Sequence, residues 1–459
     1  MPRRSGLLIV VLVLALAATA TATSLVKPSN PAQLRTGLYA SAGVESSALY
    51  CTGLSDAAGG VQGVVTFLNT ERSTRTVAIE IVSDTHHRAD ATLHLAGRTR
   101  ATLAPDQLVS GHSFGVSAVI DGGGVVADEV TSGHSSVVPC LAQGETSWYA
   151  SGLDTTVGSS AALSFYNPTA TPAVVNVTIN TPSGFAAPAS FQGLPVAAHA
   201  EVKLNLGGQI VNTRNVGVHV NVVRGTLVIA AVENSLTVGS LDVGASLPLA
   251  SAWFPRVTTA NDATAQIRLS NPGPRPAQVS VHVTLGSFHV PDQSVSVGAF
   301  ASTDVTITPN PAIPAAGLAQ VTLSASEPVV ATLAVGTSAG VALTPTPTPG
   351  GLFEVADLGV GYATATLTNT SDHAVEVTFV PSFNVQTVGS AADSSPVLLS
   401  IAPISVGAHA TIDLIHATNH ASLNGLALEV RASRPSVIVV ATLTSTPVGV
   451  DVVVESDGG

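Results

Sequence analysis

The stretch that decides the fold is Ala162-Leu-Ser-Phe-Tyr-Asn167-Pro168, followed after a short polar turn by Val175-Asn-Val-Thr-Ile179. Apolar and polar side chains alternate in both halves. Such alternation places one row of side chains inward and the next outward, as in a β-strand with one buried face. Asn167 and Pro168 suit a turn, because an Asn side chain can bond the backbone and Pro presets φ. The stretch therefore predicts two strands joined by a turn.

The same pattern recurs three more times along the chain. Each copy has an aromatic or apolar anchor, an alternating strand that ends in Asn, a polar turn and a second alternating strand. The strand-ending asparagines are separated by 98, 104 and 98 residues, and a period this regular in a chain of 459 residues indicates four copies of one unit. These asparagines are Asn69, Asn167, Asn271 and Asn369.

About 100 residues with six or seven short alternating strands are typical of an antiparallel sandwich. The composition agrees, because 45% of residues are hydrophobic, only 10% are charged, and small and β-branched residues dominate. We expect an all-β chain of four tandem antiparallel, Ig-like β-sandwich repeats after an N-terminal segment. The expected ranges are 1–23 for a signal peptide or signal anchor, 24–43 for a stalk, 44–144, 145–248 and 249–343 for repeats 1 to 3, 344–350 for a Thr/Pro linker, and 351–459 for repeat 4.

The first residues resemble an export signal. Arg3 and Arg4 precede an apolar run over residues 7–18, and Ala20-Thr21-Ala22 provides a small-residue cleavage site. The alternative is an uncleaved anchor helix, although the apolar run is short for a bilayer span. Either interpretation brings the N-terminal segment to the membrane and places residues 24–459 outside the cytoplasm, secreted or anchored to the plasma membrane.

Two cysteines, Cys51 and Cys140, are present. In an exported chain a pair of cysteines is expected to form a disulfide. Closing a loop of 88 residues would stabilise the fold by roughly 4 kcal/mol in the chain-entropy model. A redox motif or a zinc site would need a C-x-x-C pair or further thiols, which the chain lacks. We therefore predict a structural disulfide.

The net charge of −12 argues against nucleic acid as a partner, since that binding needs a basic surface. For metal, the candidates are His86, His87 and His94, but adjacent residues on a strand point to opposite faces and no carboxylate completes the set. We expect no metal site. The run Asp121-Gly-Gly-Gly124 with Asp128-Glu129 downstream lacks the residues of a phosphate or calcium loop, and it predicts a hairpin turn followed by a solvated strand.

Catalytic motifs are also missing from the sequence. No G-x-S-x-G elbow occurs, and no Asp or His recurs in all four copies. We expect no catalytic residue, no cofactor and no enzymatic activity, although a site confined to one copy would escape this argument.

The aromatic pairs Trp148-Tyr149 and Trp253-Phe254 have two interpretations. One member of each pair faces outward if the pair lies on a strand, so Trp148 and Trp253 are candidates for stacking on a sugar ring. The favoured interpretation is that bulky aromatics fill a core otherwise built from Val and Ala.

The chain resembles an actinobacterial extracytoplasmic family of unknown function with repeated β-sandwich units. The resemblance rests on the signal segment, Tyr50-Cys51, Cys140 shortly before Trp148-Tyr149, and the Leu163-Ser-Phe-Tyr-Asn-Pro168 stretch. The chain departs from the pattern at Leu49, where the family has Trp, and in lacking Pro-Gly after Cys51. In that family the genes lie near those of envelope glycosyltransferases, so the resemblance implies a role in the cell envelope, and it implies no catalytic residues.

Two hypotheses for function follow. The first is a non-catalytic extracytoplasmic envelope protein that acts as a scaffold or binds a protein partner, because tandem units offer long surfaces without a shared polar pocket. The second is a module that binds a glycan or a cell-wall polysaccharide through outward aromatic residues.

Overall fold

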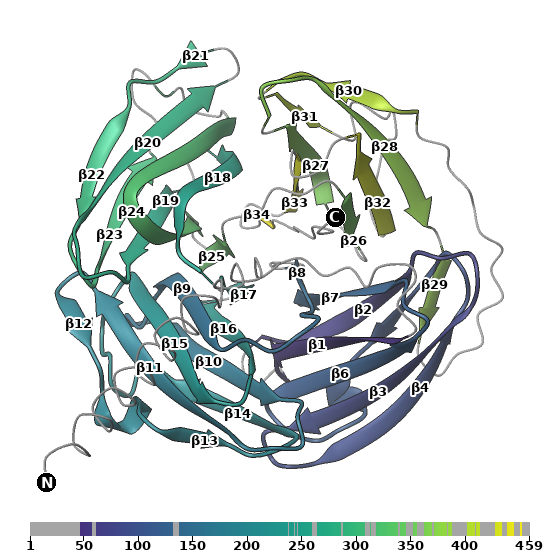
Figure 1. The fold of residues 1–459 in the computed structure, drawn as a ribbon. Coiled ribbons are helices and arrows are strands. Elements are labelled where there is room, and N and C mark those ends of the chain that lie inside the picture. The colour runs from purple at the N-terminus through teal and green to yellow at the C-terminus, as the bar shows by residue number, and fades with distance from the viewer. Residues whose placement is uncertain are drawn as a thin grey trace, which may run out of the picture. The chain divides into compact units, whose positions relative to one another are not determined.

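The structure is a computed structural model, and it describes residues from Ser46 to Asp451 with internal gaps, the longest at 388–401 and 414–426. All of the described residues belong to one compact unit, residues 36–459. The expected signal segment, the stalk and residues 346–350 of the Thr/Pro linker lie outside the described residues. Where the chain is described, it forms β-strands and two short 3-10 helices, η1 (Pro105–Gln107) and η3 (Ala189–Phe191), with no α-helix. The chain is all-β (Figure 1).

For description, the strands are divided in chain order into group 1 (β1–β8), group 2 (β9–β17), group 3 (β18–β25) and group 4 (β26–β34). Group 1 has two antiparallel sheets. The first sheet has the order β1 (Ser46–Leu54), β6 (Phe114–Asp121), β3 (Arg75–Ser83), β4 (Arg88–Leu95). The second has the order β5 (Thr99–Leu103), β2 (Gly63–Asn69), β7 (Val125–Thr131), β8 (Val137–Pro139), and β29 (Asn384–Thr387) adds a parallel strand beside β5.

Group 2 repeats this arrangement with small additions. Its first sheet contains β9 (Ser147–Leu153), β15 (Val216–Arg224) and β11 (Ala173–Thr181), with β12 (Gly184–Ala186) and β13 (Leu194–Val196) paired to β11. Its second sheet has the order β14 (Ala200–Asn205), β10 (Ser159–Asn167), β16 (Val228–Ser235), β17 (Val238–Asp242). The deciding stretch of the sequence therefore forms β10 and β11, which lie in different sheets.

Groups 3 and 4 contain the remaining strands. Group 3 comprises β18 (Leu249–Thr258), β19 (Thr264–Asn271), β20 (Ala277–Leu285), β21 (Phe288–His289), β22 (Gln293–Val297), β23 (Ala301–Ile307), β24 (Leu318–Thr337) and β25 (Gly340–Pro345). Group 4 comprises β26 (Leu352–Val355), β27 (Tyr362–Asn369), β28 (Val375–Ser382), β30 (Ile404–Val406), β31 (Thr411–Asp413), β32 (Ala427–Ala432), β33 (Ile438–Thr444) and β34 (Val450–Asp451). In group 4, β26-β32-β28-β30 and β31-β27-β33-β34 are separate sheets.

Strand β24 departs from the expectation of short strands. Its first part pairs with β20 and its last part with β19, so one strand of 20 residues passes through both sheets of group 3. In group 2 the corresponding strands β15 and β16 are separate, and Gly225 lies between them with a positive φ of 81°. β24 has Glu327-Pro328 at this point, without a glycine, so the strand continues. Together with a single bridge between Thr181 and Ala301, this continuity links the sheets of groups 2 and 3 into one hydrogen-bonded path.

The four asparagines that mark the predicted period make matching hydrogen bonds. Each is fully buried, its side-chain nitrogen lies within hydrogen-bond distance of three backbone carbonyls, and its side-chain oxygen accepts the backbone N–H two residues later. Asn167, for example, bonds the carbonyls of Thr171, Val196 and Ala197. The asparagine therefore fixes its own turn against the turn that precedes the next strand of the same sheet.

Three apolar cores lie between the paired sheets of groups 1, 2 and 3. The core of group 1 also contains Ala230, Val232 and Leu241, which come from β16 and β17 of group 2. The core of group 2 likewise includes Ala334 from β24 of group 3. Each of these two cores therefore includes residues from the next group. Strand β16, for example, is buried on both faces and contributes to the cores of groups 1 and 2.

Candidate functional site

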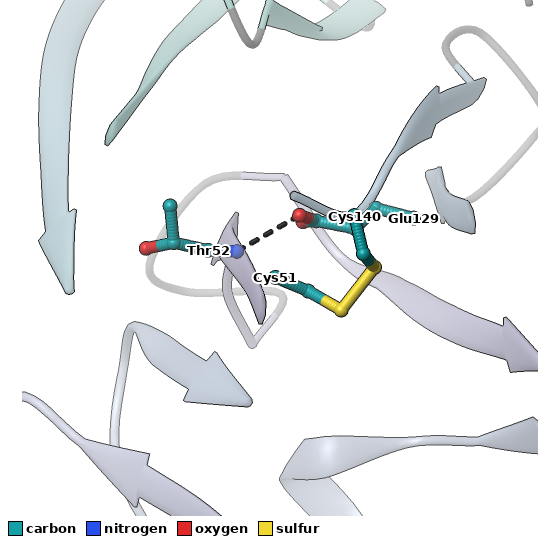
Figure 2. Close-up of a disulfide and its surroundings, with 4 residues drawn as sticks. All are labelled: Cys51, Thr52, Glu129 and Cys140. Carbon is teal, nitrogen blue, oxygen red and sulfur yellow. Dashed lines mark hydrogen bonds between the residues drawn. A yellow bond between two sulfur atoms is a disulfide. The ribbon is translucent and has the colours of Figure 1, made fainter. Parts of the chain in front are cut away.

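Cys51 on β1 and Cys140 after β8 form a disulfide, as the sequence predicted (Figure 2). Both side chains are buried in the core of group 1. The bond joins the first sheet of the group to the second, because β1 and β8 belong to different sheets. Within the described residues no cysteine is free.

Glu129 on β7 lies beside this disulfide, with 1% of its surface exposed. Its Oε1 accepts the backbone N–H of Thr52 at 2.8 Å, and its Oε2 has no hydrogen-bond partner. A carboxylate oxygen of Glu129 and the two sulfurs all lie within 4.8 Å of one another. Burial raises the pKa of Glu129 well above its usual value, because a charged carboxylate loses its hydration in the core. Since the two sulfurs are bonded to each other, the group offers no thiolate to a metal.

The prediction of a solvated strand after the Gly-Gly-Gly run was wrong. Gly122, Gly123 and Gly124 do form the turn, all with positive φ, but every residue of β7 is buried. Asp128 on the outer face is as buried as Glu129 on the inner face. Two adjacent residues on a strand point to opposite faces of the sheet, but the sequence does not show whether another part of the protein covers either face.

A second buried acid, Glu201 on β14, lies where group 2 meets group 1. Its Oε2 accepts the hydroxyl of Thr52 at 2.9 Å, and its Oε1 accepts the hydroxyls of Ser113 at 3.0 Å and of Ser164. Burial raises the pKa of Glu201 to about 7, against the opposing effect of these three hydrogen bonds. Thr52 bonds Glu129 with its backbone and Glu201 with its side chain, so it connects the disulfide to the contact between groups.

A buried cation occupies the corresponding contact between groups 2 and 3. Arg268 on β19 has 2% of its surface exposed, donates to the carbonyl of Gly152, and lies 3.9 Å from the carboxylate of Asp154. Burial lowers the pKa of Arg268, and the neighbouring carboxylates oppose that shift. Glu233 accepts the backbone N–H of Asp154 at 3.1 Å, and burial raises the pKa of Glu233 well above its usual value.

The two tryptophans proposed for sugar stacking occupy different environments. Trp148 is 1% exposed in the core of group 2, so neither face of its ring is available to a ligand and the core interpretation applies. Trp253 is partly exposed and lies opposite Thr322, whereas its neighbour Phe254 is buried. In group 2, Tyr149 lies opposite His219 and occupies the position that Trp253 has in group 3. Trp253 is therefore structurally equivalent to Tyr149 and not to Trp148.

Tyr149 was named from the sequence only as the neighbour of Trp148, yet Tyr149 is the outward-facing aromatic residue of this pair. Its ring stacks on that of His219, with centroids 4.3 Å apart and planes inclined by 5°. Both residues are half-buried on the outward face of the first sheet, and the hydroxyl of Ser147 lies 3.4 Å from the His219 ring. Burial lowers the pKa of His219. An outward aromatic residue paired with His across a strand was the signal that could have identified this position.

The histidines considered for metal binding are dispersed. His86 lies in a turn, His87 bonds the hydroxyls of Thr85 and Ser110, and the His94 ring lies 3.4 Å from the hydroxyl of Thr76. Among the described residues, the one set of three metal-ligating side chains close enough to share an ion is Cys51, Glu129 and Cys140.

The fold and the site together define an all-β protein of several antiparallel sheets, two of which are joined by a buried disulfide. A disulfide is consistent with an extracytoplasmic protein. Within the part of the chain that is described, no helix has the length and hydropathy of a membrane span. The chain belongs to a family of unknown function, DUF5719, whose sequence model matches residues 138–386, more than half of the chain.

No curated protein matches the chain. Among solved structures, the chain matches a tetra-tandem repeat from the extending region of a large adhesion protein, at 13% identity, a TM-score of 0.11, and coverage of 89% of this chain and 98% of that one. It also matches an α-L-rhamnosidase of Streptomyces avermitilis complexed with L-rhamnose, at 9% identity, a TM-score of 0.13, and coverage of 83% and 55%. Neither likeness carries an argument at these TM-scores.

Proposed function

We propose that the chain is a non-catalytic extracytoplasmic protein of the cell envelope that acts as a structural scaffold or binds a protein partner. The observation that supports this proposal is that group 2 shares buried faces with group 1 and with group 3. Strands β10 and β16 of group 2 are covered on both sides, and Ala230 and Val232 on β16 belong to the core of group 1. A chain whose sheets are packed against each other in this way holds its surfaces in fixed positions, which is what a scaffold requires.

The finer architecture is part of the same proposal. It comprises four tandem Ig-like repeats of about 100 residues over the ranges given above, an N-terminal segment that directs export or anchors the chain, and an actinobacterial source. Support for the repeats comes from the matching hydrogen bonds of the four asparagines, and support for export comes from the disulfide.

Export is tested by expressing the full chain in a bacterial host and fractionating the cells. We expect the protein outside the cytoplasm, attached to the membrane or released. Alkylation without a reductant followed by intact-mass measurement should leave both cysteines unmodified. A cytoplasmic protein with two alkylated thiols would contradict the proposal.

The scaffold role is tested with a variant that separates two groups. At Gly217 on β15 a side chain would meet Ser270 of group 3, with Cβ atoms 2.6 Å apart, so Gly217→Val should force the sheets apart. In a strain that lacks the native gene, we expect the full chain to restore envelope integrity and Gly217→Val to fail. Gly208→Ala is the matched control, because a Cβ at Gly208 meets nothing within 4 Å. Equal rescue by all three, or turnover of an envelope substrate by the purified chain, would contradict the scaffold role.

The second candidate function is binding of a glycan or cell-wall polysaccharide. The observation that favours it is the partly exposed pair Tyr149 and His219, which presents an aromatic ring beside the polar side chains of Asn176, Thr178 and Asn221. Aromatic faces next to hydrogen-bonding groups suit sugar rings, which have apolar faces and hydroxyl edges.

Glycan arrays and cell-wall pulldown with residues 24–459 test this candidate. Tyr149→Ala should abolish saturable binding without loss of folding. Phe185→Ala is the control, because Phe185 is also an exposed aromatic of group 2, at 54% exposure, but contacts Phe300 rather than His219. No binding by the parent chain would exclude the glycan candidate and leave the scaffold.

A further inference from the structure

Glu129 occupies a core position of β7 that pairing within the sheet does not require to be acidic. Glu129 pairs with Val65 on β2. At the equivalent position of group 2, Ala231 pairs with Leu163. In group 3, Leu333 pairs with Ile267. Groups 2 and 3 therefore fill this core position with an apolar side chain. Group 1, which contains the disulfide, fills it with a carboxyl group at a cost in desolvation.

The surroundings of Glu129 leave one of its oxygens free for chemistry. Oε1 is held by the backbone N–H of Thr52, directly after Cys51, whereas Oε2 is buried and has no partner. The carboxyl group lies within 4.8 Å of both sulfurs (Figure 2). Burial favours the neutral acid, and the one N–H donor, which favours the carboxylate, opposes this only in part.

We propose that Glu129 is the proton acceptor for closure of the Cys51–Cys140 disulfide. A small-molecule or protein disulfide first oxidises one cysteine, forming a mixed disulfide and releasing its other half as a thiol. The remaining thiol transfers its proton to the Glu129 carboxylate, and its sulfur attacks the cysteine sulfur of the mixed disulfide. The new S–S bond forms, the bond to the oxidant breaks, and the oxidant leaves as a thiolate that takes a proton from water.

The proton transfer is favoured by the environment in which it occurs. The thiolate is the attacking species, and a thiol enclosed by apolar side chains ionises poorly, so a neighbouring base is needed. Glu129 loses its charge as the core closes, which removes the desolvation cost of the carboxylate. The charged groups that act on Glu129 are Glu201 from β14 and Asp128 on β7 itself, and both favour the neutral acid. Each of these neighbours therefore favours the product of the step.

Oxidative refolding of the reduced full chain with oxidised glutathione tests this role. Samples quenched in acid are separated into the mixed disulfide and the closed disulfide. Glu129→Gln keeps an acceptor for the Thr52 N–H but cannot take a proton. We expect its closure step to be about a hundredfold slower near pH 7, at the low end of general-base effects. The gap should narrow near pH 9, where a thiol of ordinary pKa ionises without help.

Two controls separate proton transfer from folding. Glu233→Gln removes a similarly buried acid of group 2, which interacts with Asp154 and Arg268, and this variant should close at the parent rate. Glu129→Asp keeps the acid, and it should close faster than Glu129→Gln even where both fold slowly. Equal closure rates for the parent chain and Glu129→Gln at pH 7 would overturn the proposal. Equal slowing in Glu233→Gln, or the same slowing in concentrated urea, would overturn it as well.

Discussion

The contact between groups 1 and 2 and the contact between groups 2 and 3 use the same positions with opposite chemistry. Ser164 pairs with Lys203 and Ala230, and Arg268 pairs with Asp304 and Thr332, so Ser164 and Arg268 are equivalent positions. In the first contact Ser164 helps to solvate a buried acid, Glu201. In the second, Arg268 itself is the buried charge, next to Asp154.

Close approach of the backbones is what the two contacts share. Gly115 is the second residue of β6 and faces the ring of Tyr166, and Gly217 is the second residue of β15 and faces Ser270. The comparison teaches that the docking geometry is set by a glycine on one sheet, whereas the polar residues that fill the contact can change as long as each buried charge finds local partners.

The largest effect is expected from Arg268→Ala. This variant removes the buried cation beside Asp154 and Glu233 and leaves Asp154 paired only with the exposed Arg214, and loss of one partner of a buried ionic group destabilises by about 3–5 kcal/mol. Urea denaturation measures the change. Arg275→Ala is the control, since Arg275 is paired with Glu327 but its side chain is 74% exposed, and it should cost less than about 1 kcal/mol. Equal effects of the two variants would contradict the role assigned to Arg268.

The acidic contact should respond to pH instead. Because the pKa of Glu201 is raised to about 7 in the fold, the native state binds more protons than the unfolded chain between about pH 4.5 and 7. Its contribution to stability is complete below about pH 4.5 and is lost as pH rises through 7. Relative to Glu201→Gln, the parent chain should lose at most about 3 kcal/mol over this window in urea denaturation. If the stability of Glu201→Gln depended on pH in the same way as that of the parent chain, the assignment would be contradicted. Arg268→Ala is the control, because this variant retains Glu201 and should keep the pH dependence of the parent chain.

The shared geometry can be broken at the glycines. Gly217→Ala should cost about 2 kcal/mol, as for overpacking of a core, because the new Cβ meets the Ser270 side chain. Adding Ser270→Gly should restore most of that loss in calorimetry. At the first contact, Gly115→Ala should not be rescued by Tyr166→Phe, because the atoms in collision are ring carbons that Phe retains. Rescue by Tyr166→Phe would show that the hydroxyl, and not the ring, sets the spacing.

The smallest effect is expected at the rim of the first contact. His199 lies 3.3 Å from the carboxylate of Glu80, and both side chains are partly exposed. His199→Ala should therefore destabilise by less than about 1 kcal/mol, and the loss should vanish in high salt. His282→Ala is the control, since His282 pairs with Asp292 inside group 3. If His199→Ala destabilised the fold by more than this and the loss persisted in high salt, the ion pair with Glu80 would contribute more to the contact between groups 1 and 2 than we predict.

Several features were predictable because they depend on neighbours in the sequence. Alternation over 162–167 and 175–179 gave strands β10 and β11, and the spacing of the asparagines marked four equivalent buried turns. The disulfide followed from the number of cysteines. The covered outer faces did not follow, because Ser164 and Tyr166 alternate with apolar residues and therefore resemble a solvated row, although both are buried.

Alternation along each strand is a local property, so the sequence by itself determined that the described part of the chain is built from β-strands. The presence of two cysteines in a chain predicted to be exported determined that Cys51 is joined to Cys140. Only the tertiary structure decided that Thr52 bonds Glu201, 149 residues away, that Arg268 lies beside Asp154, and that Glu129 faces the sulfurs. These contacts join strands distant in the chain, and a polar side chain has the same local pattern whether water or another sheet covers it.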